Sequence, residues 1–180
     1  MLRRVASDTF IDASTRDLAM VRHKPSGLEC VAPVTGGFSL EVFPPTAAHP
    51  GVYCARSEGN VAISFVAVFY GPDIDIDSEF AQALAASVGQ ASPQPWTGEP
   101  SAADKASPEG LPHFRISRFQ ANVNDAPSYL RVAMAEAHGW FLQQVVSGPV
   151  ADAERIEGDA GADWRRALAA FAKNVPENPA

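Results

Sequence analysis

The sequence predicts an α+β protein in which two amphipathic helices pack against an antiparallel sheet. Three observations support this fold class. Short segments rich in β-branched and aromatic residues follow one another, with tight turns between them. Two other segments carry apolar residues at helical spacing. Consecutive hairpins form antiparallel pairs, and the apolar stripes of both helices must be buried on the sheet. The result is an α/β sandwich.

Five strands are predicted before the first helix. Their ranges are 18–22, 28–32, 38–42, 52–56 and 61–70. A turn at 24–27 joins the first two, because its proline and glycine suit the early and late positions of a turn. The strand at 61–70 is apolar on both faces and rich in β-branched and aromatic residues. We therefore expect it inside the sheet, covered on both sides.

The first helix is predicted from Asp77 to Val88. Asp77 can accept a backbone hydrogen bond as the N-cap, and Gly89 is suited to the position after the last helical residue. Phe80, Leu84 and Val88 recur at every fourth position, which gives the helix one buried stripe.

Three more strands and a helix complete the predicted fold. The strands cover 113–123, 128–137 and 140–146, and His138-Gly139 is a two-residue hairpin turn between the last two. The apolar residues of the strand at 113–123 change face midway, which predicts a bulge near Ser117-Arg118. The closing helix covers 163–173, with Trp164, Leu168 and Phe171 on one face.

A chain of 180 residues suits a single domain, which we place at 17–175. Residues 1–16 are mixed and polar, and we expect a loosely ordered N-terminal arm. Residues 90–112 are dominated by Ser, Pro, Ala and Gly, so they predict a long loop. Long loops in compact domains are often functional, and Trp96 is the one aromatic residue that could anchor this one.

Charge and hydropathy exclude several kinds of partner. The net charge of −7 argues against binding nucleic acid or an anionic membrane surface, both of which attract basic proteins. No apolar run is long enough to span a bilayer as a helix. The first residues lack the apolar core of a signal peptide, so the expected compartment is the cytoplasm.

The two cysteines leave two alternatives open. Cys30 and Cys54 lie in predicted strands and form no CxxC motif, which argues against a redox pair or a zinc knuckle. They are either small buried hydrophobic residues, the alternative we favour, or a disulfide between neighbouring strands. A disulfide would matter only in an exported protein.

The order of these elements resembles the PsbP-like fold family, which includes the Ran-binding Mog proteins. The residues that carry the resemblance are the hairpin of Leu130 to Met134 and Gly139 to Leu142, followed by the helix from Trp164 to Phe171. The resemblance implies an α/β sandwich and an accessory or binding role. It implies no shared active site, so no functional residues are transferred.

No motif in the sequence predicts catalysis, a cofactor or a metal site. Asp73, Asp75 and Asp77 alternate like the start of a calcium loop, but the later glycine and glutamate ligands of an EF-hand are missing. The four histidines show no metal-binding spacing. No nucleophile elbow or phosphate-binding loop is present. We therefore expect no enzyme activity and no cofactor.

The candidate binding residues are aromatic and basic, on the predicted strands and the long loop. They are Trp96, Arg115, Arg118, Tyr129 and Arg131. If the three arginines shared the solvent face of the sheet, they would form a basic patch on an acidic protein. The leading hypothesis is a non-catalytic binding or accessory module that contacts a partner protein or a second copy of itself. The alternative is a ligand-binding protein or enzyme with a pocket between the sheet and the 90–112 loop.

Overall fold

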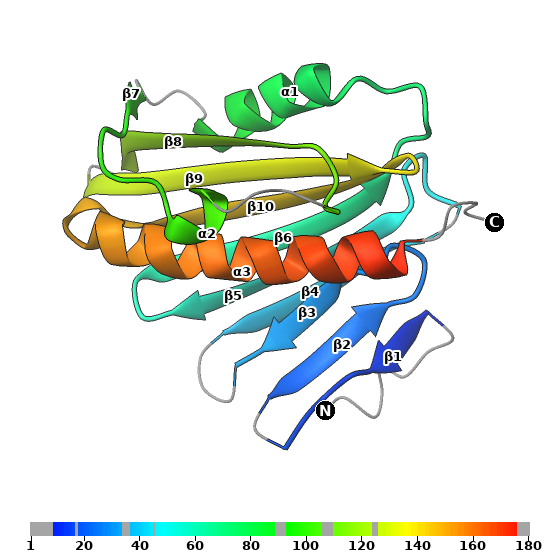
Figure 1. The fold of residues 1–180 in the computed structure, drawn as a ribbon. Helices are drawn as coiled ribbons and strands as arrows, with labels where there is room; N and C mark the ends of the chain where they lie inside the picture. Colours follow the sequence, from blue (N-terminus) through cyan, green and yellow to red (C-terminus); the bar gives the residue numbers. More distant parts are fainter. Residues whose placement is uncertain are drawn as a thin grey trace.

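The computed structural model describes residues 9–16, 18–33, 37–44, 46–88, 93–105, 110–123 and 126–175. The described chain forms a three-stranded and a seven-stranded antiparallel sheet, with helices on both faces of the larger one (Figure 1). The predicted α+β class with antiparallel sheets is therefore confirmed.

The small sheet has the order β1-β2-β3 and the large sheet the order β4-β5-β6-β10-β9-β8-β7. The strands of the small sheet are β1 (Phe10–Asp12), β2 (Ala19–His23) and β3 (Glu29–Ala32). Those of the large sheet are β4 (Phe38–Phe43), β5 (Gly51–Glu58), β6 (Val61–Phe69), β7 (Gln94–Pro95), β8 (Phe114–Val123), β9 (Ala126–Ala137) and β10 (Trp140–Pro149).

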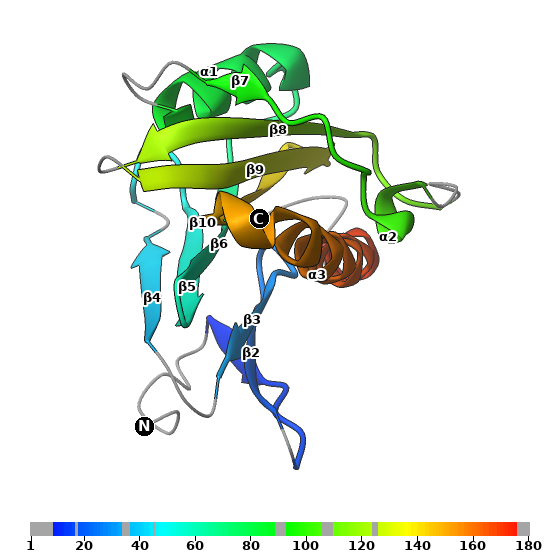
Figure 2. The ribbon, with the colours of Figure 1, turned by 90° about the vertical axis from the view of Figure 1, so that its left-hand side faces the viewer.

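In the described part of the chain, three helices accompany the sheets: α1 (Ile76–Val88), α2 (Ala102–Lys105) and α3 (Ala153–Asn174). A single 3-10 turn, Val150–Asp152, joins β10 to α3. In Figure 2, α3 lies on one side of the large sheet, and α1 lies beside β8 away from α3. Strands β4 and β5 form the end of the sheet farthest from α1.

Each side of the large sheet has its own apolar core. On the α3 side, Trp164, Leu168 and Phe171 are fully buried against the sheet, as their spacing predicted. On the other side, Phe80 of α1 packs with Met134 and Phe141. The large sheet therefore buries apolar side chains on both of its faces.

Helix α1 begins slightly earlier than predicted. Its N-cap interaction comes from Asp75, whose Oδ2 accepts a hydrogen bond from the backbone N–H of Ser78 at 3.1 Å. Asp77, the predicted N-cap, instead accepts hydrogen bonds from Arg115. The carboxylates that resemble the start of a calcium loop thus cap a helix and form an ion pair.

The hairpin between β9 and β10 is confirmed. Ala137 pairs with Trp140, and both turn residues have positive φ, 52° at His138 and 79° at Gly139, which matches a type I′ turn. A Cβ on Gly139 would stand 2.8 Å from the backbone carbon of Gly71, so the close approach of two chain segments also requires glycine there.

The predicted bulge in β8 is wrong. The register with β9 runs without interruption from Phe114 opposite Ala135 to Val123 opposite Ala126. The apolar residues change face because both faces of β8 are covered: Phe114 packs against Trp164 of α3, and α1 contacts the strand on the other side.

Two segments differ from the expected loops. Residues 10–12, within the predicted arm, form β1, which pairs with β2 and buries Phe10. The 90–112 loop contains β7 and α2, so part of it is ordered against the domain. Residues 1–8, 89–92 and 106–109 lie outside the described part of the chain.

Cys30 and Cys54 form a disulfide, so the structure selects the second of the two alternatives. The bond joins β3 of the small sheet to β5 of the large sheet, and their Cα atoms lie 6.0 Å apart. Both cysteines are buried. Among the helices described, none has the length and apolarity that crossing a membrane would need.

Candidate functional site

Two strands bring a pair of arginines under helix α3. Arg118 of β8 lies directly opposite Arg131 of β9, so both side chains share one face of the sheet. Arg131 is fully buried between the apolar residues Leu130 and Val132 of β9. A buried guanidinium requires carboxylates nearby, because an unpaired charge is very costly away from water.

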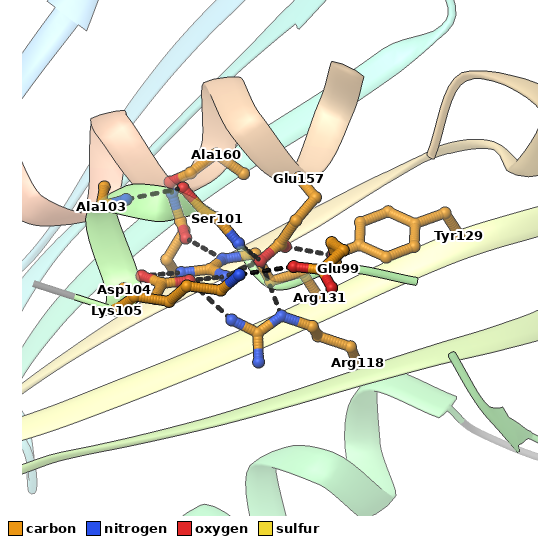
Figure 3. A network of polar contacts seen from close by, with 11 residues as sticks. Glu99, Ser101, Ala103, Asp104, Lys105, Arg118, Tyr129, Arg131, Glu157 and Ala160 are labelled. Atoms are coloured by element: carbon orange, nitrogen blue, oxygen red, sulfur yellow. Dashed lines mark hydrogen bonds and ion pairs between the residues drawn. The ribbon is translucent and has the colours of Figure 1, made fainter. Parts of the chain in front are cut away.

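Asp104 of α2 and Glu157 of α3 supply these carboxylates. Arg131 Nη1 lies 2.8 Å from Asp104 Oδ2 and 3.1 Å from Glu157 Oε2. Arg118 bonds the same two groups, through Nη2 to Asp104 at 2.6 Å and through Nε to Glu157 at 2.7 Å. Figure 3 shows both guanidinium groups directed at both carboxylates. We call these four residues, together with Tyr129, the ion cluster.

Further hydrogen bonds satisfy the remaining polar atoms around the cluster. The Tyr129 hydroxyl donates to Glu157 Oε2, and the backbone N–H of Ser101 donates to Glu157 Oε1 at 2.9 Å. Arg131 Nε donates to Gln144 Oε1 at 3.1 Å, and Gln144 Nε2 donates to the Ala160 carbonyl at 3.0 Å. The buried groups thus form a connected network rather than isolated pairs.

Burial and charge act in opposite directions on the acid of this cluster. Burial alone would raise the pKa of the Glu157 carboxyl, but the charge of Arg131 and the hydrogen bond from Tyr129 outweigh it and lower the pKa. Burial and the hydrogen bond to Glu157 raise the pKa of Tyr129. Glu157 therefore stays charged and Tyr129 stays neutral near pH 7.

The ion cluster fastens residues 93–105, which we call the strap, to the domain. At one end, Trp96 donates its backbone N–H to the Arg118 carbonyl at 3.1 Å and packs its ring edge-on against Tyr129. At the other end, Asp104 and Ser101 bind the cluster and α3. None of the residues of α2 is buried, so polar contacts rather than apolar ones hold it.

All charges of the ion cluster are paired within the protein. Two arginines face two carboxylates, which leaves no net charge to attract a ligand. Removing one member would leave a buried charge without a partner, at a cost of about 3–5 kcal/mol. We conclude that the cluster fixes the strap and α3 on the sheet.

The structure brings together four of the five candidate residues predicted from the sequence. Trp96, Arg118, Tyr129 and Arg131 meet in or beside the ion cluster, but under α3 and the strap rather than on a solvent face. Arg115 lies on the opposite face of β8 and pairs with Asp77 at 2.7 Å. Its odd spacing from Arg118 requires this in a strand. The three arginines therefore form no common basic patch.

A separate groove lies between α1 and the large sheet. Its volume is about 280 Å³. The lining residues are Val66, Val68, Tyr70, Glu79, Gln82, Ala83, Ala86, Met134, Phe141 and Gln143. The floor carries the apolar side chains of Val66, Met134 and Phe141 around Gln143 of β10, and the polar side chains of α1 stand at its margin. No local pattern predicts this groove, because its lining comes from two stretches that are distant in sequence, 66–86 and 134–143.

The groove continues onto a part of the sheet that α1 does not cover. Successive strands pair Met134 with Gln143, Gln143 with Val66, and Val66 with Tyr53 across this face. Glu41 of the edge strand β4 follows Tyr53 in the same row and is exposed. Val66 and Tyr53 are only half-buried, unlike the residues on the α3 side. This uncovered half of the sheet is accessible to a partner.

A second hollow, of about 390 Å³, lies beside the strap. Trp96 forms one wall and residues 150–155 form the rest. Arg155, its one basic residue, is exposed and interacts with Asp152 and Asp159 at 3.6 and 3.4 Å. Across the described residues, no three His, Cys, Asp or Glu side chains are grouped closely enough to hold a metal ion.

The comparisons with known proteins add little to this geometry. No protein-family model matches the chain, and no curated protein is detectably similar to it. A solved structure of PA94 from Pseudomonas aeruginosa, a protein of unknown function, aligns with a TM-score of 0.35 at 14% identity. The alignment covers 84% of this chain and 93% of that one. A likeness this weak supports no statement about function.

Proposed function

We propose that this protein is a non-catalytic binding module and that the groove between α1 and the large sheet holds a segment of a partner protein. The observation that carries the proposal is the uncovered half of the sheet. Its floor, formed by the apolar Val66, Met134 and Phe141 around Gln143, stays partly exposed at Val66 and Gln143. Apolar surface with a polar margin is typical of sites that bind another polypeptide.

The ion cluster supports a non-catalytic role. Arg131, Tyr129 and Glu157 are buried, and all five residues of the cluster are engaged with one another, so they are not available to a substrate. Membership of the PsbP-like family is part of this proposal, since its known members are accessory or binding proteins. The alternative function, a ligand-binding protein or enzyme, would use the hollow beside Trp96.

Site-specific photo-crosslinking tests the proposed function. A benzophenone side chain at Gln82, which is exposed at the groove, is compared with one at Ala162, an exposed position on α3. We expect a discrete protein adduct from Gln82 alone in cells of the native host. The crosslinked segment, made as a synthetic peptide, should bind the wild-type protein and lose at least about tenfold affinity for Ala86→Trp, which fills the groove.

The matched variant Ala162→Trp should leave peptide binding unchanged. Identical adducts from both positions, or peptide binding that Ala86→Trp does not weaken, would contradict the proposal. Native mass spectrometry separates the alternative function, because a stoichiometric small molecule lost on Trp96→Ala would favour the hollow beside the strap.

We also propose that the protein works in an oxidising compartment rather than in the cytoplasm. The disulfide between Cys30 and Cys54 supports this, because cytosolic thiols are normally kept reduced. Trapping of free thiols in intact host cells tests it. We expect no labelling of either cysteine, and labelling of both would favour the cytoplasm.

A further inference from the structure

Glu79 stands in the groove without a basic partner. It lies in the first turn of α1, and its Oε1 accepts a hydrogen bond from Gln82 Nε2 at 3.0 Å. Within the described chain, no lysine, arginine or histidine forms an ion pair with it. The neighbouring acids of this segment are engaged, since Asp75 caps the helix and Asp77 pairs with Arg115.

Two aromatic rings line the groove with Glu79. Tyr70 and Phe141 pack edge to face with their centroids 5.3 Å apart, and both contribute to the lining. Glu79 is near enough to Tyr70 that its charge, after burial, helps raise the pKa of that phenol. Aromatic faces and a carboxylate together attract a cation that carries an apolar stem.

The rest of the open face has the same charge preference. The row of residues that forms the groove floor ends at the exposed Glu41 on β4. Arg115, at the other end of this row, is neutralised by Asp77. The whole chain carries a net charge of −7, which favours the approach of a basic partner.

We propose that the partner segment held in this groove presents an apolar stretch with an arginine or lysine, whose stem lies along the half-buried Tyr70 and whose head pairs with Glu79. This inference rests on the proposed function. Both long basic side chains have an apolar stem and a charged tip, so they suit a groove with an apolar floor and an acidic margin. A volume of about 280 Å³ holds a few side chains, in keeping with a short contact segment.

The test uses fluorescently labelled peptides of leucine and alanine with one central residue changed. The central residue is arginine, its uncharged isostere citrulline, or glutamate. The proteins are wild type, Glu79→Gln and a matched control, Glu154→Gln, which alters an exposed glutamate in the first turn of α3. Melting curves of both variants confirm that they fold.

Wild-type protein should bind the arginine peptide about tenfold more tightly than the citrulline peptide, and the glutamate peptide most weakly. Glu79→Gln should abolish the preference for arginine over citrulline, while Glu154→Gln should keep it. Added salt should reduce the preference, because the groove is partly open to solvent.

Equal binding of the arginine and citrulline peptides, or a preference that survives in Glu79→Gln, overturns the inference. If the peptides bind without a preference for arginine and Ala86→Trp still weakens their binding, the proposed function stands and only the inference about a basic side chain fails. Absence of binding by every peptide overturns both. Free butylguanidine that binds as tightly as the arginine peptide would assign the site to a small cation instead of a polypeptide.

Discussion

His23 is a buried titratable residue that the ion cluster does not involve. Its Nδ1 shares a hydrogen bond of 2.8 Å with Ser26 Oγ, and the rings of Phe10 and Trp140 lie beside it. Burial lowers its pKa from 6.5 to about 4. The small sheet therefore packs around a neutral imidazole at its junction with β10.

This pKa predicts that acidification destabilises the protein well above the range in which carboxylates titrate. Between pH 6.5 and 4 the unfolded chain binds a proton at His23 that the folded chain does not, so stability falls as the pH falls. We expect the free energy of unfolding in urea to decrease by about 1–2 kcal/mol between pH 7 and pH 5 through this residue.

In His23→Gln the free energy of unfolding should decrease less between pH 7 and pH 5, by about 1–2 kcal/mol. This expectation holds even if the substitution itself lowers the stability at pH 7. His138→Gln, in the exposed β9–β10 turn, should retain the full decrease. An unchanged pH dependence in His23→Gln would mean that the imidazole is accessible to protons in the folded state.

The partners of Arg131 show which features of the ion cluster the sequence can predict. Arg131 stands between the apolar residues Leu130 and Val132, a position that favours burial and so requires an acid on a neighbouring element. The sequence alone could not identify Glu157 and Asp104 as its partners, because they lie 26 and 27 residues away on different helices. Burial of a charge is visible only when the elements are assembled.

At the scale of elements, the two glycines of α3 have opposite roles. Gly158 is exposed, and a Cβ there would meet nothing within 4 Å. Gly161 is buried under the strap, and a Cβ there would clash with the side chain of Ser101. The second glycine therefore lets the strap lie directly on the helix.

We expect Gly158→Ala to raise the free energy of unfolding by about 0.5–1 kcal/mol, because alanine favours the helix over glycine. Gly161→Ala should instead lower stability, since the new methyl group displaces Ser101 and with it the hydrogen bond to Glu157. Urea denaturation compares the two variants, and limited proteolysis should show faster cleavage in the strap of Gly161→Ala only.

Equal stabilisation by both substitutions would contradict the placement of the strap directly on α3.

The same glycines explain why the sequence pattern does not predict the first half of α3. The residues it buries there include Ala153, Glu157 and Ala160, which form no large apolar stripe, and glycine lowers helix propensity further. The second half, with Trp164, Leu168 and Phe171, was predictable.

For the whole molecule, the strand list and the hairpins followed from local patterns, but the arrangement in two sheets did not. The first three strands form a separate small sheet. Pairing of β6 with β10 joins segments that are far apart in sequence, and no local signal encodes it. The groove depends on this long-range pairing.

The disulfide is the covalent link between the two sheets, and it predicts a redox-dependent stability. It connects cysteines 24 residues apart, so cutting it frees a chain segment of that length in the unfolded state and should cost about 3 kcal/mol. Urea denaturation with and without a reductant measures this. The oxidised and reduced wild-type proteins differ only in the bond, so the comparison contains no cavity effect. The double variant Cys30→Ala/Cys54→Ala is the control, and its stability should not respond to reductant.

If the reduced protein is as stable as the oxidised one, packing of Phe10, Val21 and Leu28 alone holds the small sheet in place. If it is less stable by the expected amount, the contact between the sheets depends on an oxidising environment.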